Sequence, residues 1–347
     1  MFPVFVFFGP TASGKTGILY RLFTGPASLC PAEVVSADSM QVYRGMNIGT
    51  AKPSAAERAA LPHHLIDIRE PSEQFNVGDF VRLAGEACQD IHRRGKLPVV
   101  SGGTGFYLKN FIRGLPESPP SDPQIRTTVK ADLAQKGAAA LMEELAAWDA
   151  ESAARIHLND TYRLTRALEV LRLTGRPLSS FRQNGTERKY SFFIAGLRRE
   201  REDLYRRIDA RTTEMFSRGL PSEVEALFNA GFSPADPGLR AIGYREFFTE
   251  ERENGKPLWR LLHGNARDLS AIEALVARNS RRYAKRQITY FSSLHETVWM
   301  DADSEETPTE TLRRELGEFV SRQGNSVRPD LLHPPQNSCR NGYGEEK

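Results

Sequence analysis

The stretch that decides the fold lies at the start of the chain, where Val4-Phe5-Val6-Phe7-Phe8 is followed by Gly9-Pro10-Thr11-Ala12-Ser13-Gly14-Lys15-Thr16. The continuous apolar run is typical of a buried strand, and Gly9-Pro10 is a turn signal that ends it. The eight residues after the run match the pattern GxxxxGK[ST], and Gly17-Ile18-Leu19 can begin a helix. Strand, glycine-rich loop and helix in this order predict a phosphate-binding loop.

Such a loop binds anions because its backbone N–H groups and the N-terminus of the following helix line a concave surface. Lys15 adds a full positive charge, and the Thr16 hydroxyl is available to Mg²⁺. The loop recognises a diphosphate and not the group attached to it, so ATP, another nucleotide and an isoprenyl diphosphate are equally possible ligands at this point. The predicted diphosphate-binding residues are Gly9, Pro10, Thr11, Ala12, Ser13, Gly14, Lys15 and Thr16.

Further apolar runs indicate more strands of the same kind. They are Val34-Val35 and residues 65–68, 97–100 and 192–197, and helical patterns such as that of residues 79–94 separate some of them. Short buried strands that alternate with helices favour a parallel sheet covered on both faces. We therefore predict an α/β fold of the P-loop NTPase type, with a parallel sheet flanked by helices.

The segment of residues 114–190 differs, because strand-like runs give way to helical periodicity. One helix in it is well marked: Asn159 or Asp160 can cap its start, Gly175 can end it, and its apolar face contains Leu164, Leu168 and Leu171. We expect an inserted all-helical subdomain here, within a core that includes helices at 204–227 and 269–291. The expected division is a core of residues 1–113 and 191–302, an insertion of 114–190 and a tail of 303–347 that is largely disordered from 323.

Composition places the chain among ordinary globular proteins, with 347 residues, 39% of them hydrophobic, and a net charge of +3. No apolar run approaches the roughly 20 residues that span a bilayer, so we expect a cytoplasmic protein without membrane contact.

Cys30, Cys88 and Cys339 lie far apart without a CxxC pair, which argues against a disulfide framework and a zinc site. His63 and His64 have no third ligand nearby and are interpreted as structural. We expect a monomer.

Polar residues follow two of the predicted strands. Asp38 comes just past Val34-Val35, and Thr104 stands in the glycine-rich turn Ser101-Gly102-Gly103-Thr104-Gly105. Because ligands bind at the carboxyl ends of strands in open α/β sheets, both side chains should lie near the phosphate loop. A carboxylate there can accept a proton or hold Mg²⁺ through water. A turn-forming Asp38 and a plain strand-to-helix turn at Thr104 remain open alternatives.

Basic residues are concentrated near the end of the core. Residues 278–295 contain no acidic side chain, and on a helix the cations of this segment fall at spacings of three, four and seven. Such a stripe suits RNA phosphates, although a solvated basic face would explain it when it is taken alone. The cations are Arg278, Arg281, Arg282, Lys285 and Arg286.

Five motifs are spread over most of the chain. They read GPTASGKT at residues 9–16, ADSMQVYRGMNIGTAKP at 37–53, SGGTGFYLK at 101–109, RAIGYREF at 240–247 and AKRQITYF at 284–291. In these motifs, and in their order and spacing over residues 2–299, the chain resembles the bacterial tRNA dimethylallyltransferase family.

The resemblance implies a donor, an acceptor and a set of site residues. The phosphate loop would hold dimethylallyl diphosphate with Mg²⁺ on Thr16, and the acceptor would be N6 of the adenosine 3′-adjacent to the anticodon, in the anticodon stem-loop of tRNA. The implied catalytic residues are Asp38 as proton acceptor, Thr104 beside it, and Arg211, which would neutralise the leaving diphosphate. The tRNA contacts of the family map onto Asp38, Ser39, Met40, Gln41, Thr104, Arg126, Tyr162, Arg163, Leu164, Thr165, Arg166, Arg240, Ala241, Ile242, Gly243, Tyr244 and Arg245.

Two other classes of function compete with this hypothesis. A small-molecule P-loop kinase or an adenylate isopentenyltransferase would use the same loop and Asp38, but neither needs a cationic surface of RNA size. A nucleotide-gated RNA-binding protein would have no use for Asp38 and Thr104 beside the phosphate loop. The sequence therefore favours prenyl transfer to tRNA.

Overall fold

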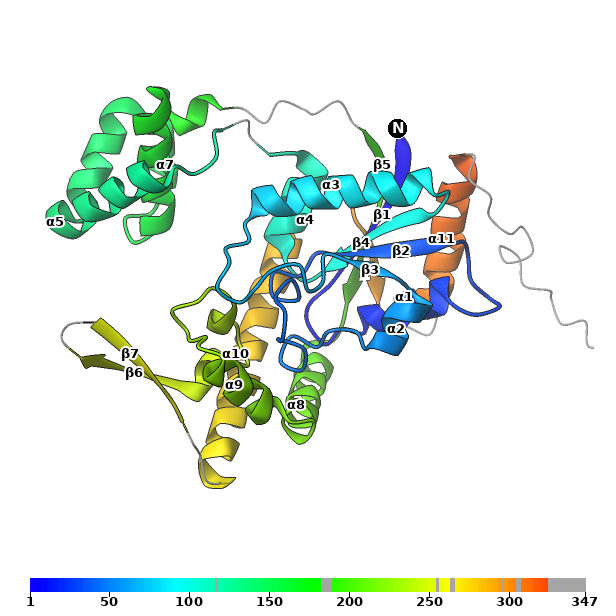
Figure 1. The fold of residues 1–347 in the computed structure, drawn as a ribbon. Coiled ribbons are helices and arrows are strands. Elements are labelled where there is room, and N and C mark those ends of the chain that lie inside the picture. Colours follow the sequence, from blue (N-terminus) through cyan, green and yellow to red (C-terminus); the bar gives the residue numbers. More distant parts are fainter. Residues whose placement is uncertain are drawn as a thin grey trace, which may run out of the picture. The chain divides into compact units, whose positions relative to one another are not determined.

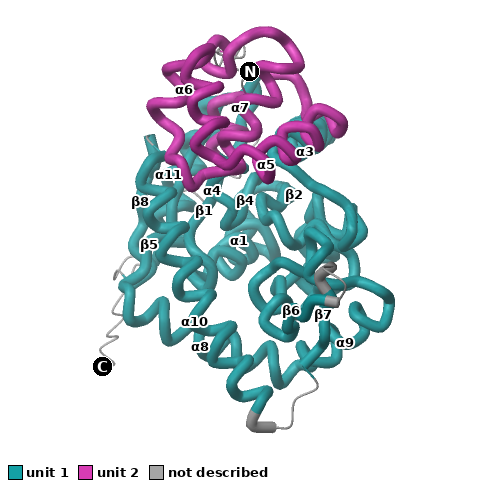
Figure 2. The backbone as a smooth tube through the Cα atoms, turned by 90° about the vertical axis from the view of Figure 1, so that its left-hand side faces the viewer, with its two compact units in different colours: residues 1–108, 189–347 teal, residues 109–188 magenta. Residues whose placement is uncertain are grey.

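The computed structural model describes residues 1–115, 118–181, 189–253, 256–262, 266–294, 296–303 and 307–323. The chain divides into two compact units, one of Met1–Leu108 with Lys189–Lys347 and one of Lys109–Arg188 (Figure 2). The second unit is thus inserted between two segments of the first. Its observed bounds differ from the expected 114–190, because the chain leaves the first unit within helix α4 (Gly105–Arg113).

The first unit is built on a six-stranded sheet in the order β3-β2-β4-β1-β5-β8, and every pairing in it is parallel. Figure 1 shows helices along the faces of this sheet, so the predicted α/β class is confirmed. The strands are β1 (Phe2–Phe8), β2 (Ala32–Ser36), β3 (His63–His64), β4 (Leu97–Gly102), β5 (Tyr190–Arg198) and β8 (Val298–Asp301). The helices, besides α4, are α1 (Lys15–Phe23), α2 (Ala55–Ala60), α3 (Val77–Arg93), α8 (Arg201–Ser217), α9 (Leu220–Asn229), α10 (Ala266–Phe291) and α11 (Pro308–Arg322).

The apolar run that begins the chain forms the central strand β1, and its residues from Val4 onward are completely buried. Because side chains alternate across a strand, Phe5 and Phe7 share one face of the sheet, where they pack in one cluster with α1 and α11. Phe8 belongs to the other face, and its ring lies 4.7 Å from that of Phe291 at the end of α10. Burial on both faces explains why this strand has no polar side chain.

One predicted strand was wrong. Residues 65–68 were expected to be a strand, but the segment that pairs with β2 is His63–His64. Leu65 and Asp67 have φ of 61° and 57°, in the left-handed region that strands do not use. Leu65 and Ile66 are nevertheless buried. The apolar run therefore indicates side chains that pack in the interior, and it does not indicate a strand of the sheet.

The helices after β5 are interrupted where the sequence indicated continuity. The predicted helix 204–227 consists of α8 and α9, because Gly219 between them adopts φ of 95°. The predicted helices 79–94 and 269–291 correspond to α3 and α10. An antiparallel hairpin of β6 (Phe248–Glu253) and β7 (Lys256–Leu261), which the sequence did not indicate, precedes α10, and short 3-10 turns lie at η2 (Gly238–Arg240) and η3 (Arg245–Phe247).

The segment expected to begin a tail at residue 303 contains helix α11. Thr307 and Glu310 form a capping box at its start. Leu312, Leu316 and Val320 recur every four residues and join the cluster around β1 and α1, so this apolar face attaches the helix to the sheet. Residues 324–347, for which disorder was predicted, lie outside the described residues.

The described residues of the second unit form helices α5 (Pro123–Trp148), α6 (Ala150–Arg155) and α7 (Thr161–Thr174) and a 3-10 turn, η1 (Leu178–Ser180), besides the end of α4. Helix α7 is the well-marked helix of the sequence. The Asp160 carboxylate accepts the N–H of Arg163 at its start, and Gly175 ends it with φ of 69°. Its Leu164 and Leu168 pack against α5, and together they make a small core.

Two further expectations concern membranes and cysteines. Over the described ranges, no helix has the length and apolar character needed to cross a bilayer. Cys30 and Cys88 are buried free thiols, and burial raises the pKa of Cys30 to about 12, so neither is a reactive thiolate. Cys339 lies outside the described residues.

Candidate active site

The phosphate loop connects β1 to α1. Gly14 occupies the N-cap position of α1 with φ of 98°, a conformation that glycine adopts without strain. The Lys15 ammonium donates to the carbonyl oxygens of Gly9 and Pro10, each at 2.8 Å. Ser13 Oγ is buried and has no hydrogen-bond partner among the described residues. Because buried hydroxyls are normally paired, this one fits a loop in which a phosphate oxygen completes the hydrogen bonding.

Three arginines from outside the loop hold it in place. Arg211 Nη1 donates to Thr11 Oγ1 at 3.0 Å. Arg207 and Arg199 donate through Nε to loop carbonyls at 2.9 and 3.4 Å. The sequence indicated only Arg211. Arg207 lies one turn before it on the same face of α8, a spacing that could have pointed to it, whereas Arg199 precedes the helix and carried no such signal.

Burial and a neighbouring cation change the acidity of the loop lysine. Burial and the Arg211 guanidinium lower the pKa of Lys15 to about 7, and the Asp38 carboxylate opposes this change in part. A lysine with this pKa is only partly charged at neutral pH. An anion in the loop would raise the pKa again, because an opposite charge at short range favours the ammonium form.

Asp38 follows β2 and performs the turn-forming role that the sequence left open. Its Oδ1 accepts the backbone N–H of Met40 at 2.8 Å and that of Gln41 at 3.3 Å. Thr104 Oγ1 accepts the N–H of Ser39 at 3.0 Å, so the glycine-rich turn after β4 supports the same segment. The turn therefore orients Asp38 and does not exclude a chemical role for its carboxylate.

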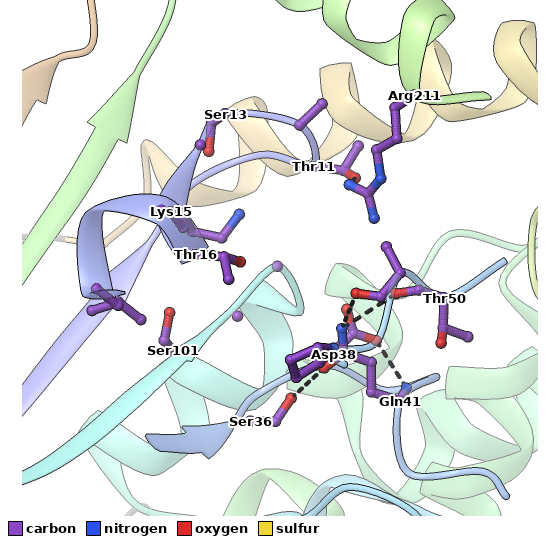
Figure 3. A pocket seen from close by; sticks show the side chains of 18 of the residues that line it. Thr11, Ser13, Lys15, Thr16, Ser36, Asp38, Gln41, Thr50, Ser101 and Arg211 are labelled. Atoms are coloured by element: carbon purple, nitrogen blue, oxygen red, sulfur yellow. Dashed lines mark hydrogen bonds between the residues drawn. The ribbon is translucent and has the colours of Figure 1, made fainter. Parts of the chain in front are cut away.

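Two cavities meet at this turn. The first has a volume of about 510 Å³ and contains the phosphate loop from Thr11 to Thr16, and the second has a volume of about 370 Å³ and includes Arg240 and Arg245. Figure 3 shows Lys15 and Thr16 on one side of the first cavity, Asp38 and Gln41 across from them, and Arg211 reaching in from α8. The residues that line both cavities are Thr11, Ala12, Asp38, Thr50, Arg211 and Tyr283.

Most of the predicted site residues of the first unit line one of these cavities. Ser39, Met40, Arg240, Ala241, Ile242, Gly243 and Arg245 line the second cavity, and Gln41 lines the first. Four do not line either: Gly9 and Pro10, whose carbonyls bind Lys15, Thr104, whose hydroxyl binds Ser39, and Tyr244. The Thr104 hydroxyl thus supports the Asp38 turn, and its expected role in the reaction stays a prediction.

Two predicted tRNA contacts have side chains that face inward. Tyr244 is fully buried because its ring packs in the cluster around α9, and Leu164 is fully buried because it belongs to the apolar face of α7. Their side chains are therefore turned away from solvent, and the tRNA contacts expected at these two positions stay predictions. In the second unit, Arg126, Tyr162 and Arg163 are exposed, and Thr165 and Arg166 are half-buried.

A single carboxylate fixes the loop that borders the second cavity. Glu223 of α9 accepts the backbone N–H groups of Asn47 at 2.9 Å, Ile48 at 2.8 Å and Gly49 at 3.2 Å. It also accepts the hydroxyl of Tyr244 at 2.7 Å, which is the role that the buried tyrosine has here. Since Gly49 lines the second cavity, this carboxylate shapes the wall of the site.

We expect Glu223→Ala to lower the free energy of unfolding by about 1–3 kcal/mol, because four donors lose a charged acceptor at once. Glu225→Ala is the matched control, since Glu225 is an exposed carboxylate on the same helix and its loss should change stability by less than about 0.5 kcal/mol. Urea unfolding of the two variants measures the difference. Equal stability of both would contradict the role given to Glu223.

The predicted basic stripe lies on α10. Arg278, Arg282, Lys285 and Arg286 are exposed, whereas Arg281 forms an ion pair with Asp209 of α8. The opposite side of the same helical turns contributes Tyr283 and Gln287 to the cavities, and no sequence pattern indicated either residue by itself.

The protein side chains offer little to a metal ion by themselves. No group of three or more His, Cys, Asp and Glu side chains suited to a metal occurs in the described part of the chain. Thr16 and Asp38 both line the first cavity, however, and Mg²⁺ commonly takes one or two protein oxygens and completes its shell with phosphate oxygens and water. The site therefore fits Mg²⁺ when a diphosphate is present.

Comparison with known proteins gives a consistent result. Residues 41–294 match the family model described as IPP transferase. The tRNA dimethylallyltransferase of Geobacter sulfurreducens is 45% identical over 295 residues, which cover 84% of this chain and 90% of that protein.

Solved structures agree with this result. The tRNA isopentenylpyrophosphate transferase of Bacillus halodurans is 36% identical with a TM-score of 0.61, and the match covers 93% of this chain and 97% of that one. A eukaryotic dimethylallyltransferase, described as acting on tRNA, has a TM-score of 0.75 at 24% identity, with coverage of 95% and 82%, and supports the fold.

Proposed function

This chain belongs to the IPP transferase family and is a tRNA-modifying prenyltransferase, and from this premise we propose that it moves a dimethylallyl group from dimethylallyl diphosphate to N6 of the adenosine 3′-adjacent to the anticodon. The supporting observation is the pair of cavities that share Asp38 and Arg211. The first contains the phosphate loop and suits the donor. The second is bordered by exposed arginines and suits a base that has left its stack, which costs less in a single-stranded loop.

The donor end of the site acts on the leaving group. In the proposed complex the loop amides, Lys15 and Arg211 surround the diphosphate. As the bond between C1 of the prenyl group and the diphosphate oxygen breaks, its electron pair goes to that oxygen. Fixed cations and N–H groups stabilise this growing negative charge more than they stabilise the ground state, and such electrostatic stabilisation is usually the largest part of catalysis.

The acceptor end of the site acts on the amine. The lone pair of an adenine N6 is delocalised into the ring, so the nitrogen is a poor nucleophile and has to be positioned. Its lone pair forms the new bond to C1, and the proton that it loses passes to the Asp38 carboxylate. Asp38 suits this role because it lines both cavities while its turn is held by backbone N–H groups.

Mg²⁺ fits the same proposal, because the cavity of the phosphate loop offers it protein oxygen atoms. The residues that would hold it are Thr16 and Asp38. When bound, the ion would neutralise part of the charge on the diphosphate.

The exposed cations suit the RNA partner. We propose that Arg240, Arg245 and the exposed residues of the α10 stripe contact phosphates, because each is charged and accessible. In the second unit, Arg126, Tyr162 and Arg163 are the exposed members of the predicted contact set.

Transfer of labelled dimethylallyl diphosphate to an unmodified tRNA anticodon stem-loop tests the proposal, with AMP as a parallel acceptor and ATP hydrolysis monitored. We expect label on RNA that carries the target adenosine and none on RNA in which guanosine replaces it. Label on AMP would assign the chain to adenylate prenylation, and ATP turnover without label would indicate a kinase. Either result would overturn the proposed acceptor.

A further inference from the structure

Gln287 connects two loops that belong to opposite halves of the site. It lies on α10 and is 5% exposed. Its Oε1 accepts the backbone N–H of Thr11 in the phosphate loop at 2.9 Å, and its Nε2 donates to the carbonyl of Gly103 in the glycine-rich turn at 2.7 Å. One side-chain amide therefore bridges the loop after β1 and the turn after β4.

These two contacts require a glutamine. Only one orientation of the side-chain amide satisfies both partners, because the Thr11 N–H needs an acceptor and the Gly103 carbonyl needs a donor. A glutamate lacks the donor, a leucine lacks both groups, and an asparagine is one methylene shorter. The bridge is also tight, since a Cβ added at Gly103 would lie 2.4 Å from Gln287 Nε2.

Each end of the bridge leads to a group that the proposed reaction uses. Thr11 binds the Arg211 guanidinium through its hydroxyl, on the side of the leaving diphosphate. Gly103 precedes Thr104, whose hydroxyl holds the N–H of Ser39 beside Asp38. Hydrogen bonds and the short covalent segments between them thus connect the donor cradle to the Asp38 turn.

We infer that Gln287 is a positioning residue that sets the distance between the phosphate loop and the Asp38 turn, and hence between the prenyl donor and the base that receives the amine proton. The inference rests on the proposed function. The loop and the turn begin at the paired ends of β1 and β4, and without this amide they would lose the side-chain hydrogen bonds that join them beyond that pairing. A misplacement of about 1 Å between reacting groups can lower a rate by about 10²-fold.

Gln287→Leu tests the inference, because leucine keeps most of the volume and removes both hydrogen bonds. We expect the single-turnover rate constant of prenyl transfer, measured with enzyme in excess and both substrates saturating, to fall by about 10- to 100-fold. The dissociation constants for inorganic pyrophosphate and for the tRNA stem-loop should stay within about threefold of wild type. A lower rate constant with unchanged dissociation constants separates a positioning role from a binding role. With enzyme in excess, the single-turnover rate constant also does not depend on the fraction of active protein.

Two other variants complete the experiment. Thr289→Ala is the matched control, because Thr289 is exposed on the same helical turns and hydrogen-bonds only the carbonyl of Lys285 among the described residues; it should transfer at the wild-type rate. Gly103→Ala disturbs the bridge from the other end, since its new methyl group would displace only the flexible Gln287 amide. It should show the same loss of rate, and it serves if Gln287→Leu does not fold.

The outcomes separate the two proposals. If the wild-type protein transfers the prenyl group, two results would overturn the positioning role. One is a rate constant of Gln287→Leu or Gly103→Ala within threefold of wild type. The other is a loss of rate that is matched by an equal loss of pyrophosphate affinity. Absence of transfer by the wild-type protein would instead overturn the proposed function.

Discussion

Replacing Asp38 with asparagine should lower the rate of prenyl transfer by about 10²- to 10⁴-fold, the usual contribution of a positioned proton acceptor. Asparagine is the informative change because its side-chain oxygen can still accept the N–H groups of Met40 and Gln41, which keeps the turn. The substitution removes the charge and leaves the phosphate contacts of the exposed arginines unchanged. Affinity for the tRNA stem-loop should therefore stay within a few-fold of wild type.

Single-turnover transfer and equilibrium binding to the stem-loop measure these two effects. Asp90→Asn is a charge-matched control, since it removes one carboxylate from the partly exposed surface of α3, where its side chain is 48% exposed. It should leave both quantities unchanged. An equal loss of transfer and of tRNA binding in Asp38→Asn would show that Asp38 is a binding residue and would remove it from the chemistry.

Replacing Lys15 with alanine should weaken the binding of inorganic pyrophosphate by about 10- to 100-fold, because a charge-assisted hydrogen bond is worth about 1.5–3 kcal/mol. The variant also loses the two bonds that tie the lysine to Gly9 and Pro10. Isothermal titration with pyrophosphate measures the affinity. Unchanged affinity would contradict the assignment of this loop as the diphosphate site, and Lys15→Arg should lie between alanine and wild type because it keeps the charge with a different shape.

The pH dependence of the same binding gives a second measurement on Lys15. Its pKa is lowered to about 7 in the protein without ligand, and a bound diphosphate raises it, so binding takes up a proton. Affinity due to the lysine is therefore fully present below pH 7 and declines as the pH rises above 7, by at most about tenfold per pH unit. The ratio of wild-type to Lys15→Ala affinity for pyrophosphate should therefore fall as the pH rises above 7. The titration of pyrophosphate itself affects both proteins equally, so it does not change this ratio. A constant ratio from pH 6 to pH 9 would be inconsistent with the lowered pKa.

Much of the fold could be predicted from the sequence because its determinants are local. A strand buried on both faces has to be apolar throughout, as β1 is, and a phosphate loop needs its glycines and lysine at fixed spacing within eight residues. The ends of α7 could be read from Asp160 and Gly175 for the same reason. Where the prediction failed, at residues 65–68 and in α11, an apolar pattern was present, but its backbone conformation and its packing partner depended on distant segments.

The sequence by itself determined the fold class, the phosphate loop, the family and the position of Asp38 at the end of β2. Only the tertiary structure decided which side chains complete the site. Gln287 reaches the loop from 276 residues away, a separation that leaves no periodic signal. Arg207 reaches it from 195 residues away, and only its place one turn before Arg211 could have pointed to it. Tyr244 and Leu164 lie in segments assigned to tRNA binding, yet packing turns both inward. The physical reason is that backbone conformation follows from neighbouring residues, whereas the direction and partners of a side chain follow from whatever the fold brings against it.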